Sequence, residues 1–191
     1  REFDEAARYI DPLLAKSPSD AYLLRLKAEL ILKRDGDLEE AEKYLGRAVS
    51  DNPQDPDARV ARARVYAAHG EFSKAKADLE AAKRISTRPQ IVMQLVTVYK
   101  AMQEYDNAEL ALGELLVRRK DYEPAIKELI ELYRRRKGWR QMEQLLAEAR
   151  EQYPNSPDYL LAEASMWKQR GDMQRCLQAL QEAVKIAPNS E

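Results

Sequence analysis

Residues 63–82, with the sequence ARVYAAHGEFSKAKADLEAA, contain the pattern that decides the fold. Apolar residues recur at spacings of three and four on both sides of Gly70, a periodicity that places side chains on one face of an α-helix. These residues are Ala63 and Tyr66 before the glycine, and Ala75, Leu79 and Ala82 after it. Because glycine suits a helix C-cap and a tight turn, the stretch predicts two helices joined at Gly70.

The same pattern recurs along the chain. Short segments that open with a large apolar residue and close with a smaller or flexible one have closing residues 33 to 35 positions apart. These segments are residues 3–6, 38–41, 72–75, 105–108, 139–142 and 173–176. Each of the last five follows a helical pair, namely Ala28/Ile31, Ala63/Tyr66, Val96/Tyr99, Ile130/Tyr133 or Ala164/Trp167. A regular repeat of this length predicts stacked helix pairs that share a core.

Glycines are expected at the turn inside each repeat. They stand between the two helical series at Gly36, Gly70, Gly138 and Gly171. The third repeat has Gln103 in this place, so we expect a less relaxed turn there.

Prolines separate one repeat from the next. They stand at Pro18, Pro53, Pro56, Pro89, Pro154, Pro157 and Pro188. The segments 55–57 and 156–158 each fit a helix N-cap, a proline in the first helical position and an acidic residue at the positive end of the helix dipole. Pro12 lies inside the leading helix and should kink it. No segment alternates with a period of two, so no strand is predicted.

With these segments the sequence resembles the tetratricopeptide repeat family over essentially its whole length. Met142 and Cys176 replace the usual alanine, and no repeat has an aromatic residue in the family's first-helix tryptophan position. The resemblance implies an all-α fold, a right-handed α-α superhelix of antiparallel helix pairs with about five and a half repeats and no strands. The predicted single array, residues 1–191, contains a trailing half-repeat at 1–17 and repeats at 19–53, 55–88, 89–121, 122–154 and 156–188. We expect it to be a fragment of a longer array.

The composition and the motifs speak against catalysis. The 32 basic and 33 acidic residues give a net charge of −1, without the basic excess of a general nucleic-acid binder. The single cysteine, Cys176, falls in a packing position, and the single histidine, His69, precedes a turn glycine as a helix cap. Neither forms part of a recognisable nucleophile and base pair. We therefore predict no enzyme activity, no metal and no cofactor.

The sequence leaves the compartment open. No apolar run approaches the length of about 18 residues that a membrane span requires. Both the cytoplasm and the bacterial periplasm or envelope remain compatible with the sequence, and neither the organism nor the pathway follows from it.

In the tetratricopeptide repeat family, the first helix of each pair lines an inner, concave surface that binds partners. The resemblance implies a groove formed by Arg25, Glu29, Lys33, Val60, Arg64, Met93, Thr97, Lys100, Lys127, Glu131, Arg134, Arg135, Leu161, Ser165 and Lys168. Basic residues outnumber acidic ones in this set, which favours a protein partner, a peptide or helix with acidic and apolar side chains. Family members that clamp chaperone tails use asparagine on a first helix. No first helix here contains one, so this activity is not expected.

The main prediction is a non-catalytic protein–protein interaction scaffold or adaptor. Residues 118–140 contain nine basic and four acidic side chains, whereas residues 1–57 contain nine basic and fourteen acidic ones. Binding of a polyanion or nucleic acid through residues 118–140 and end-to-end self-association are therefore alternatives. Two further alternatives are that the chain is the non-catalytic arm of a larger enzyme, or that it is part of a bacterial envelope or polysaccharide-export assembly. A solvated face without a ligand fits the groove pattern equally well.

Overall fold

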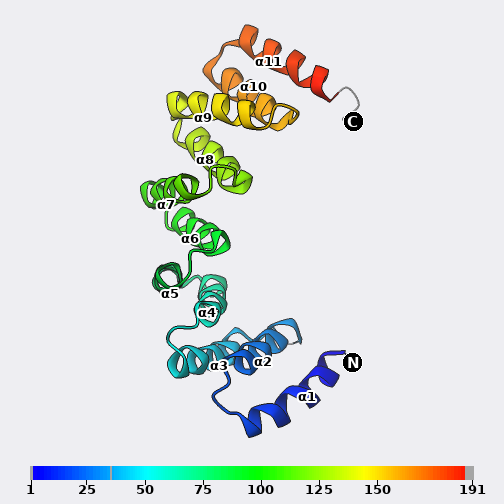
Figure 1. Ribbon diagram of the computed structural model, residues 1–191, viewed down its shortest axis with the longest axis vertical. Helices are drawn as coiled ribbons and strands as arrows, with labels where there is room; N and C mark the ends of the chain where they lie inside the picture. Colours follow the sequence, from blue (N-terminus) through cyan, green and yellow to red (C-terminus); the bar gives the residue numbers. More distant parts are fainter. Residues whose placement is uncertain (1, 35, 188–191) are drawn as a thin grey trace. The chain divides into compact units, whose positions relative to one another are not determined.

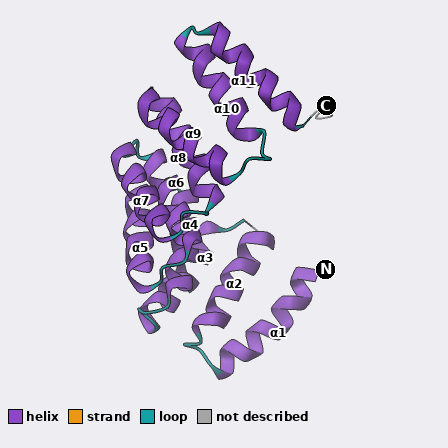
Figure 2. Ribbon diagram, turned by 45° about the horizontal axis from the view of Figure 1, so that its top comes forward, coloured by secondary structure: helices purple, strands orange, loops and turns teal. Residues whose placement is uncertain are grey.

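The computed structural model describes residues 2–34 and 36–187, and these residues form eleven α-helices and no strand (Figures 1 and 2). In chain order the helices are α1 Glu2–Lys16, α2 Ala21–Arg34, α3 Leu38–Asp51, α4 Pro56–Ala68, α5 Phe72–Ile85, α6 Pro89–Ala101, α7 Tyr105–Arg118, α8 Glu123–Arg136, α9 Trp139–Gln152, α10 Asp158–Arg170 and α11 Met173–Ile186. The all-α prediction is confirmed. The helices that the repeat pattern places second, from α3 to α11, begin at the large apolar residue that opens each motif.

The helices form two compact units, residues 1–108 and 109–191, and the boundary falls within α7. In the first unit each helix from α1 to α5 packs against the one that follows it, and α2 also contacts α4. In the second unit α9 packs against α8 and α10, and α10 packs against α11. Within each unit, successive helix pairs therefore stack on one another. The single array with the repeat bounds given above stays a prediction, and Pro188 lies outside the described residues.

The packing faces predicted from the repeat are buried in the inner helices. Leu45, Leu79 and Leu146 are nearly inaccessible, and buried small residues lie beside them on the same helix faces. The small flanking residues are Ala41, Ala48, Ala75, Ala82 and Ala149. At the ends, Leu13 of α1 and Leu180 of α11 are exposed instead. Among the described residues α1 packs mainly against α2, and α11 mainly against α10, so one side of each helix remains uncovered.

In the first helices α4, α6, α8 and α10, the turn lies at a constant distance after an aromatic residue. The fourth residue after Tyr66, Tyr99, Tyr133 and Trp167 has a positive φ in each case. These four residues are Gly70 (φ 79°), Gln103 (φ 60°), Lys137 (φ 56°) and Gly171 (φ 83°). The next amide then donates to the carbonyl of the aromatic residue, at distances from 2.8 to 3.0 Å. This is the hydrogen bond of a Schellman helix end.

The prediction that Gly138 takes the turn conformation is therefore wrong. Its φ is −75°, and Lys137 adopts the left-handed conformation in its place. Gly138 comes one residue too late, at the position where its amide donates to the Tyr133 carbonyl at 2.9 Å. A longer side chain therefore accepts the left-handed backbone at Lys137, as it does at Gln103.

Two predicted helix N-termini differ in their caps. Asp55 caps α4 as predicted, because its carboxylate accepts a hydrogen bond from the Asp57 amide at 2.8 Å. The prediction for Ser156 is wrong, since α10 begins at Asp158 after Pro157 and has no side-chain capping bond. In the leading helix, α1 continues through Pro12 to Lys16 as a single element.

Candidate partner-binding surface

All the residues predicted for the groove lie on first helices. In the unit formed by residues 1–108 they lie on α2, α4 and α6, and in the unit formed by residues 109–191 they lie on α8 and α10. We refer to these residues as the first-helix surface of each unit. Because the helices recur in register, residues that are far apart in sequence come together on it.

A hollow of ≈ 400 Å³ lies between α2 and α4 on the first-helix surface. Four predicted residues line it, namely Arg25, Glu29, Val60 and Arg64, and four further residues complete the lining, namely Tyr22, Leu26, Asp57 and Ala61. The lining combines two bases, two acids, an exposed aromatic ring and three apolar side chains. A hollow of this kind can accept an apolar side chain and bond the polar groups beside it.

Half of this lining, including Tyr22 and Asp57, was not predicted from the sequence. Tyr22 lies three residues before Arg25, and Asp57 lies three residues before Val60. A helical spacing of three places each of these pairs on one face. The spacing along each helix therefore contains a signal for Tyr22 and Asp57 as further groove residues.

Arg25 contacts both a charged and an aromatic residue of this hollow. Its Nη1 lies 3.3 Å from the Asp57 carboxylate, and its guanidinium lies over the Tyr22 ring at 5.8 Å from the centroid. The Nε atom of Arg25 is buried and has no hydrogen-bond acceptor. Burying a donor without an acceptor costs free energy, so an oxygen supplied from outside would be favourable here.

The Asp57 carboxylate on α4 joins Arg25 of α2 to Arg88, the residue that precedes α6. Besides Arg25, it accepts a hydrogen bond from Nη2 of Arg88. Burial alone would raise the pKa of Asp57, but the guanidinium groups of Arg88 and Arg25 outweigh this effect and hold the pKa below its ordinary value. Asp57 therefore remains charged, and the charge of Arg25 is already balanced within the protein.

Two more of the predicted residues of this unit, Arg64 and Thr97, form hydrogen bonds within the protein. Nε of Arg64 donates to Oε1 of Gln94 on α6 at 3.2 Å. The Thr97 hydroxyl donates to the Met93 carbonyl at 3.1 Å on its own helix. Lys33 is exposed, whereas Lys100 is partly buried.

In the second unit, two of the predicted cations pair with acids on the first helices α8 and α10. Nζ of Lys127 contacts Asp158 on α10 at 2.7 Å and Glu123 on α8 at 3.0 Å, and these hydrogen bonds raise the pKa of Lys127. Nε of Arg134 donates to Glu131 at 3.0 Å. On the same surface Arg135, Leu161 and Lys168 are exposed, whereas Ser165 is partly buried.

The basic region at residues 118–140 is partly neutralised. Besides the ion pairs of Lys127 and Arg134, Arg136 contacts Glu109 on α7 at 2.9 Å. Several of its nine basic side chains are thus balanced by nearby carboxylates, which weakens the case for a polyanion site.

No catalytic or metal site is apparent in the described part of the chain. His69 is an exposed helix cap and Cys176 is buried, as the sequence predicts. Residues 2–34 and 36–187 contain no group of three or more metal-ligating side chains. Within the same residues, every helix is too short or too polar to cross a membrane.

The comparisons with known families agree with the fold. The fold and the first-helix surface define a helical repeat scaffold. One tetratricopeptide repeat model matches residues 32–93 and a second matches residues 1–56. The chain belongs to the tetratricopeptide repeat family, whose members are generally non-catalytic scaffolds for protein interactions. A comparison of the sequence with curated proteins found no match.

Similar solved structures include several tetratricopeptide repeat proteins. YrrB, described as a TPR protein with an unusual peptide-binding site, is 18% identical with a TM-score of 0.69, covering 95% of this chain and 93% of its own. MamA from Desulfovibrio magneticus RS-1 is 16% identical with a TM-score of 0.70, covering 90% and 97%. PilF from Pseudomonas aeruginosa is 14% identical with a TM-score of 0.71, covering 99% and 86%. Identities this low show a shared fold only.

Proposed function

We propose that this protein is a non-catalytic scaffold that binds a segment of a partner protein on its first-helix surface. We infer further that the hollow between α2 and α4 takes part of that segment. The observation that carries the proposal is the convergence of four sequence-predicted groove residues, Arg25, Glu29, Val60 and Arg64, on one hollow. The peptide-binding site described for YrrB, a protein of the same fold, supports a peptide ligand.

The chemistry of the hollow restricts the segment. A main-chain carbonyl or a carboxylate oxygen would satisfy the buried Nε of Arg25. An apolar side chain would contact Leu26 and Val60, while Glu29 and Arg64 would select the charge on either side. Since the lining contains two acids and two bases, we expect a segment of mixed charge with an apolar anchor, whereas the sequence suggested a segment with acidic and apolar side chains.

The test is a selection of random peptides of about 12 residues displayed on phage, followed by anisotropy measurements with the enriched sequences. Reversing charges on the rim, with Glu29→Lys and Arg64→Glu, should weaken binding of these peptides by about tenfold or more. Lys43→Glu reverses an exposed charge on the second helix α3 and is the matched control. Enriched peptides that bind both rim variants as well as the original protein, or a selection that enriches none, would contradict the proposal.

A further inference from the structure

Two grooves lie between second helices in the unit formed by residues 109–191, one repeat apart. The first, between α7 and α9, has a volume of ≈ 410 Å³, and the second, which involves α9, α10 and α11, has a volume of ≈ 530 Å³. Their linings correspond at a spacing of 34 residues: Gly113 with Ala147, Leu116 with Arg150, Val117 with Glu151, Ile126 with Leu160, and Glu148 with Glu182. The same scaffold therefore presents two related sites with different side chains.

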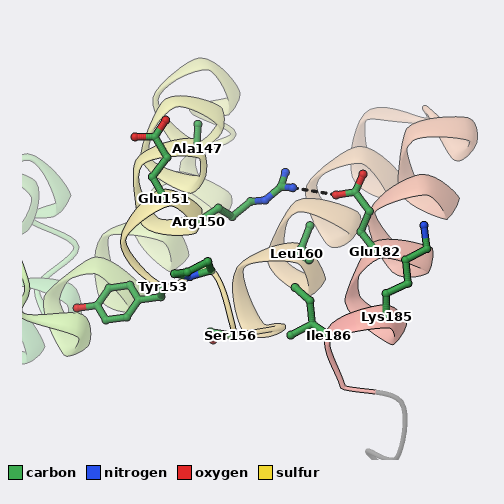
Figure 3. Close-up of a pocket in the computed structure, with 10 residues that line it drawn as sticks. Ala147, Arg150, Glu151, Tyr153, Ser156, Leu160, Glu182, Lys185 and Ile186 are labelled. Carbon is green, nitrogen blue, oxygen red and sulfur yellow. Dashed lines mark hydrogen bonds and ion pairs between the residues drawn. The ribbon is translucent and has the colours of Figure 1, made fainter.

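The second groove is crossed by an ion pair. Nη2 of Arg150 lies 2.8 Å from Glu182 on α11 (Figure 3). Nη1 of Arg150 lies 2.8 Å from Glu163 on α10. Arg150 reaches from α9 toward α11 and satisfies the acid on the opposite helix. Two of the charged side chains that line this groove, Arg150 and Glu182, are thus paired with each other.

The first groove lacks this bridge. Leu116 takes the place of Arg150 and cannot bond Glu148, which instead accepts a hydrogen bond from Gln144 on its own helix at 3.0 Å. The buried side chains of Ile126 and Ala149 and the partly buried Leu145 complete an apolar lining. We call this site the α7–α9 groove.

Exposed apolar side chains continue beyond the α7–α9 groove. Val117 on its wall is 80% exposed, and Leu110, seven residues earlier on the same face of α7, is 63% exposed. The equivalent positions on α9 are Glu151 and Gln144, both polar. A single exposed apolar residue is ordinary, but two on one helix face beside an apolar groove form the kind of patch that marks an interaction site.

Charges of opposite sign border the α7–α9 groove. Arg118, Arg119 and Lys120 are exposed at the C-terminal end of α7, and Lys120 itself lines the groove. The α9 side contributes Glu148 to the lining and the exposed Glu151 nearby. A helix whose apolar ridge has acids along one flank and bases along the other would complement both borders in a single orientation.

We propose that the α7–α9 groove is a second docking site, which takes an amphipathic helix of a partner protein. Its apolar ridge packs on Leu110, Leu116 and Val117. Its acidic flank faces Lys120 and its basic flank faces Glu148. Most of its lining comes from the second helices α7 and α9, and the proposal does not depend on the peptide-binding role of the first-helix surface.

The probe is a fluorescent synthetic helix of about 14 residues, about four turns, with leucines on one face, glutamates on one flank and lysines on the other. A second peptide of the same composition has the two flanks exchanged. We expect the peptide with the complementary arrangement to bind the full chain, and the exchanged peptide to bind about tenfold more weakly. Equal binding of the two peptides, or binding of neither, would overturn the proposal.

Two variants test the site, one in the α7–α9 groove and one on the first-helix surface. Val117→Glu introduces the residue found at Glu151 and should weaken the preferred peptide by about tenfold, with helix content and thermal unfolding unchanged because Val117 is largely exposed. Arg64→Glu on the first-helix surface should leave this binding intact, which separates the two proposed sites. An unchanged affinity of the preferred peptide for the Val117→Glu variant would contradict the proposal. So would a dimer of the original chain in light scattering that disappears in this variant, because the occupant would then be a second copy.

Discussion

Arg62 of α4 holds the buried Asp78 of α5 through two hydrogen bonds, from Nε to Oδ2 and from Nη2 to Oδ1, each 2.7 Å long. The Asp78 side chain is only 6% exposed. Arg59 adds a weaker contact at 3.4 Å, and its Nε also donates to the Pro53 carbonyl. The equivalent residues in the other second helices from α3 to α11 are Tyr44, Ala111, Leu145 and Ala179, so a charge at this core position belongs to this repeat alone.

Removing one partner of this pair should destabilise the protein more than removing both. Asp78→Leu leaves Arg62 without its carboxylate in a partly buried site and should lower the free energy of unfolding by about 2–3 kcal/mol. The double variant Arg62→Met with Asp78→Leu replaces the pair by apolar side chains and should recover most of that loss. Urea unfolding followed by circular dichroism measures both. If the double variant were as unstable as the sum of the single variants, the two residues would not act as a pair.

The left-handed backbone at Gln103 should be a correctable strain. Replacing it with glycine relieves the contact between the Cβ atom and the backbone, and should raise the free energy of unfolding by about 0.5–1 kcal/mol. The matched control is Gly70→Gln, which introduces a side chain at the equivalent turn (φ 79°) and should destabilise by a similar amount. Thermal unfolding of the two variants should shift in opposite directions, and shifts of the same sign would refute the role of φ.

Tyr133 should ionise late in alkaline titration. Burial, the charge of Glu109 and the hydrogen bond to it raise the pKa of Tyr133 to about 12. A tyrosine in the unfolded chain ionises near pH 10. The contribution of Tyr133 to the free energy of unfolding is therefore complete below about pH 10 and falls as the pH rises toward 12. The difference between the phenolate absorbance titrations of the original chain and Tyr133→Phe should isolate one group near pH 12. A difference centred near pH 10 would contradict this.

Asp57 should contribute to stability at neutral pH and lose this contribution in acid. Its folded pKa lies below the ordinary value of 3.8 because of Arg88 and Arg25, so the contribution is present above that value and disappears as the pH falls through the lower folded pKa. Asp57→Asn should therefore be less stable than the original chain at pH 7, and the two should converge in strong acid. A stability difference that does not change with pH would argue against the two ion pairs.

Much of the fold could be predicted because the information is local. The spacing of residues such as Ala75, Leu79 and Ala82 lies within one helix, and a glycine such as Gly70 encodes its own turn. The same reasoning misplaced the turn at Gly138, because its position is set by the hydrogen bond to the carbonyl of Tyr133, five residues earlier. Half of the residues that line the hollow between α2 and α4 were among those that the resemblance to the family implied for the groove.

The sequence by itself determined the repeat, the order and bounds of most helices and the faces that they bury, since each follows from a period within about four residues along a helix. Only the tertiary structure decided which charges meet. Arg25 meets Asp57, Lys127 meets Asp158, and Arg150 meets Glu182 from different helices. It also left Leu116 facing an open groove where the next repeat has a salt bridge. Such pairings depend on which side chains neighbouring helices bring within reach, and no period along a single helix encodes that distance.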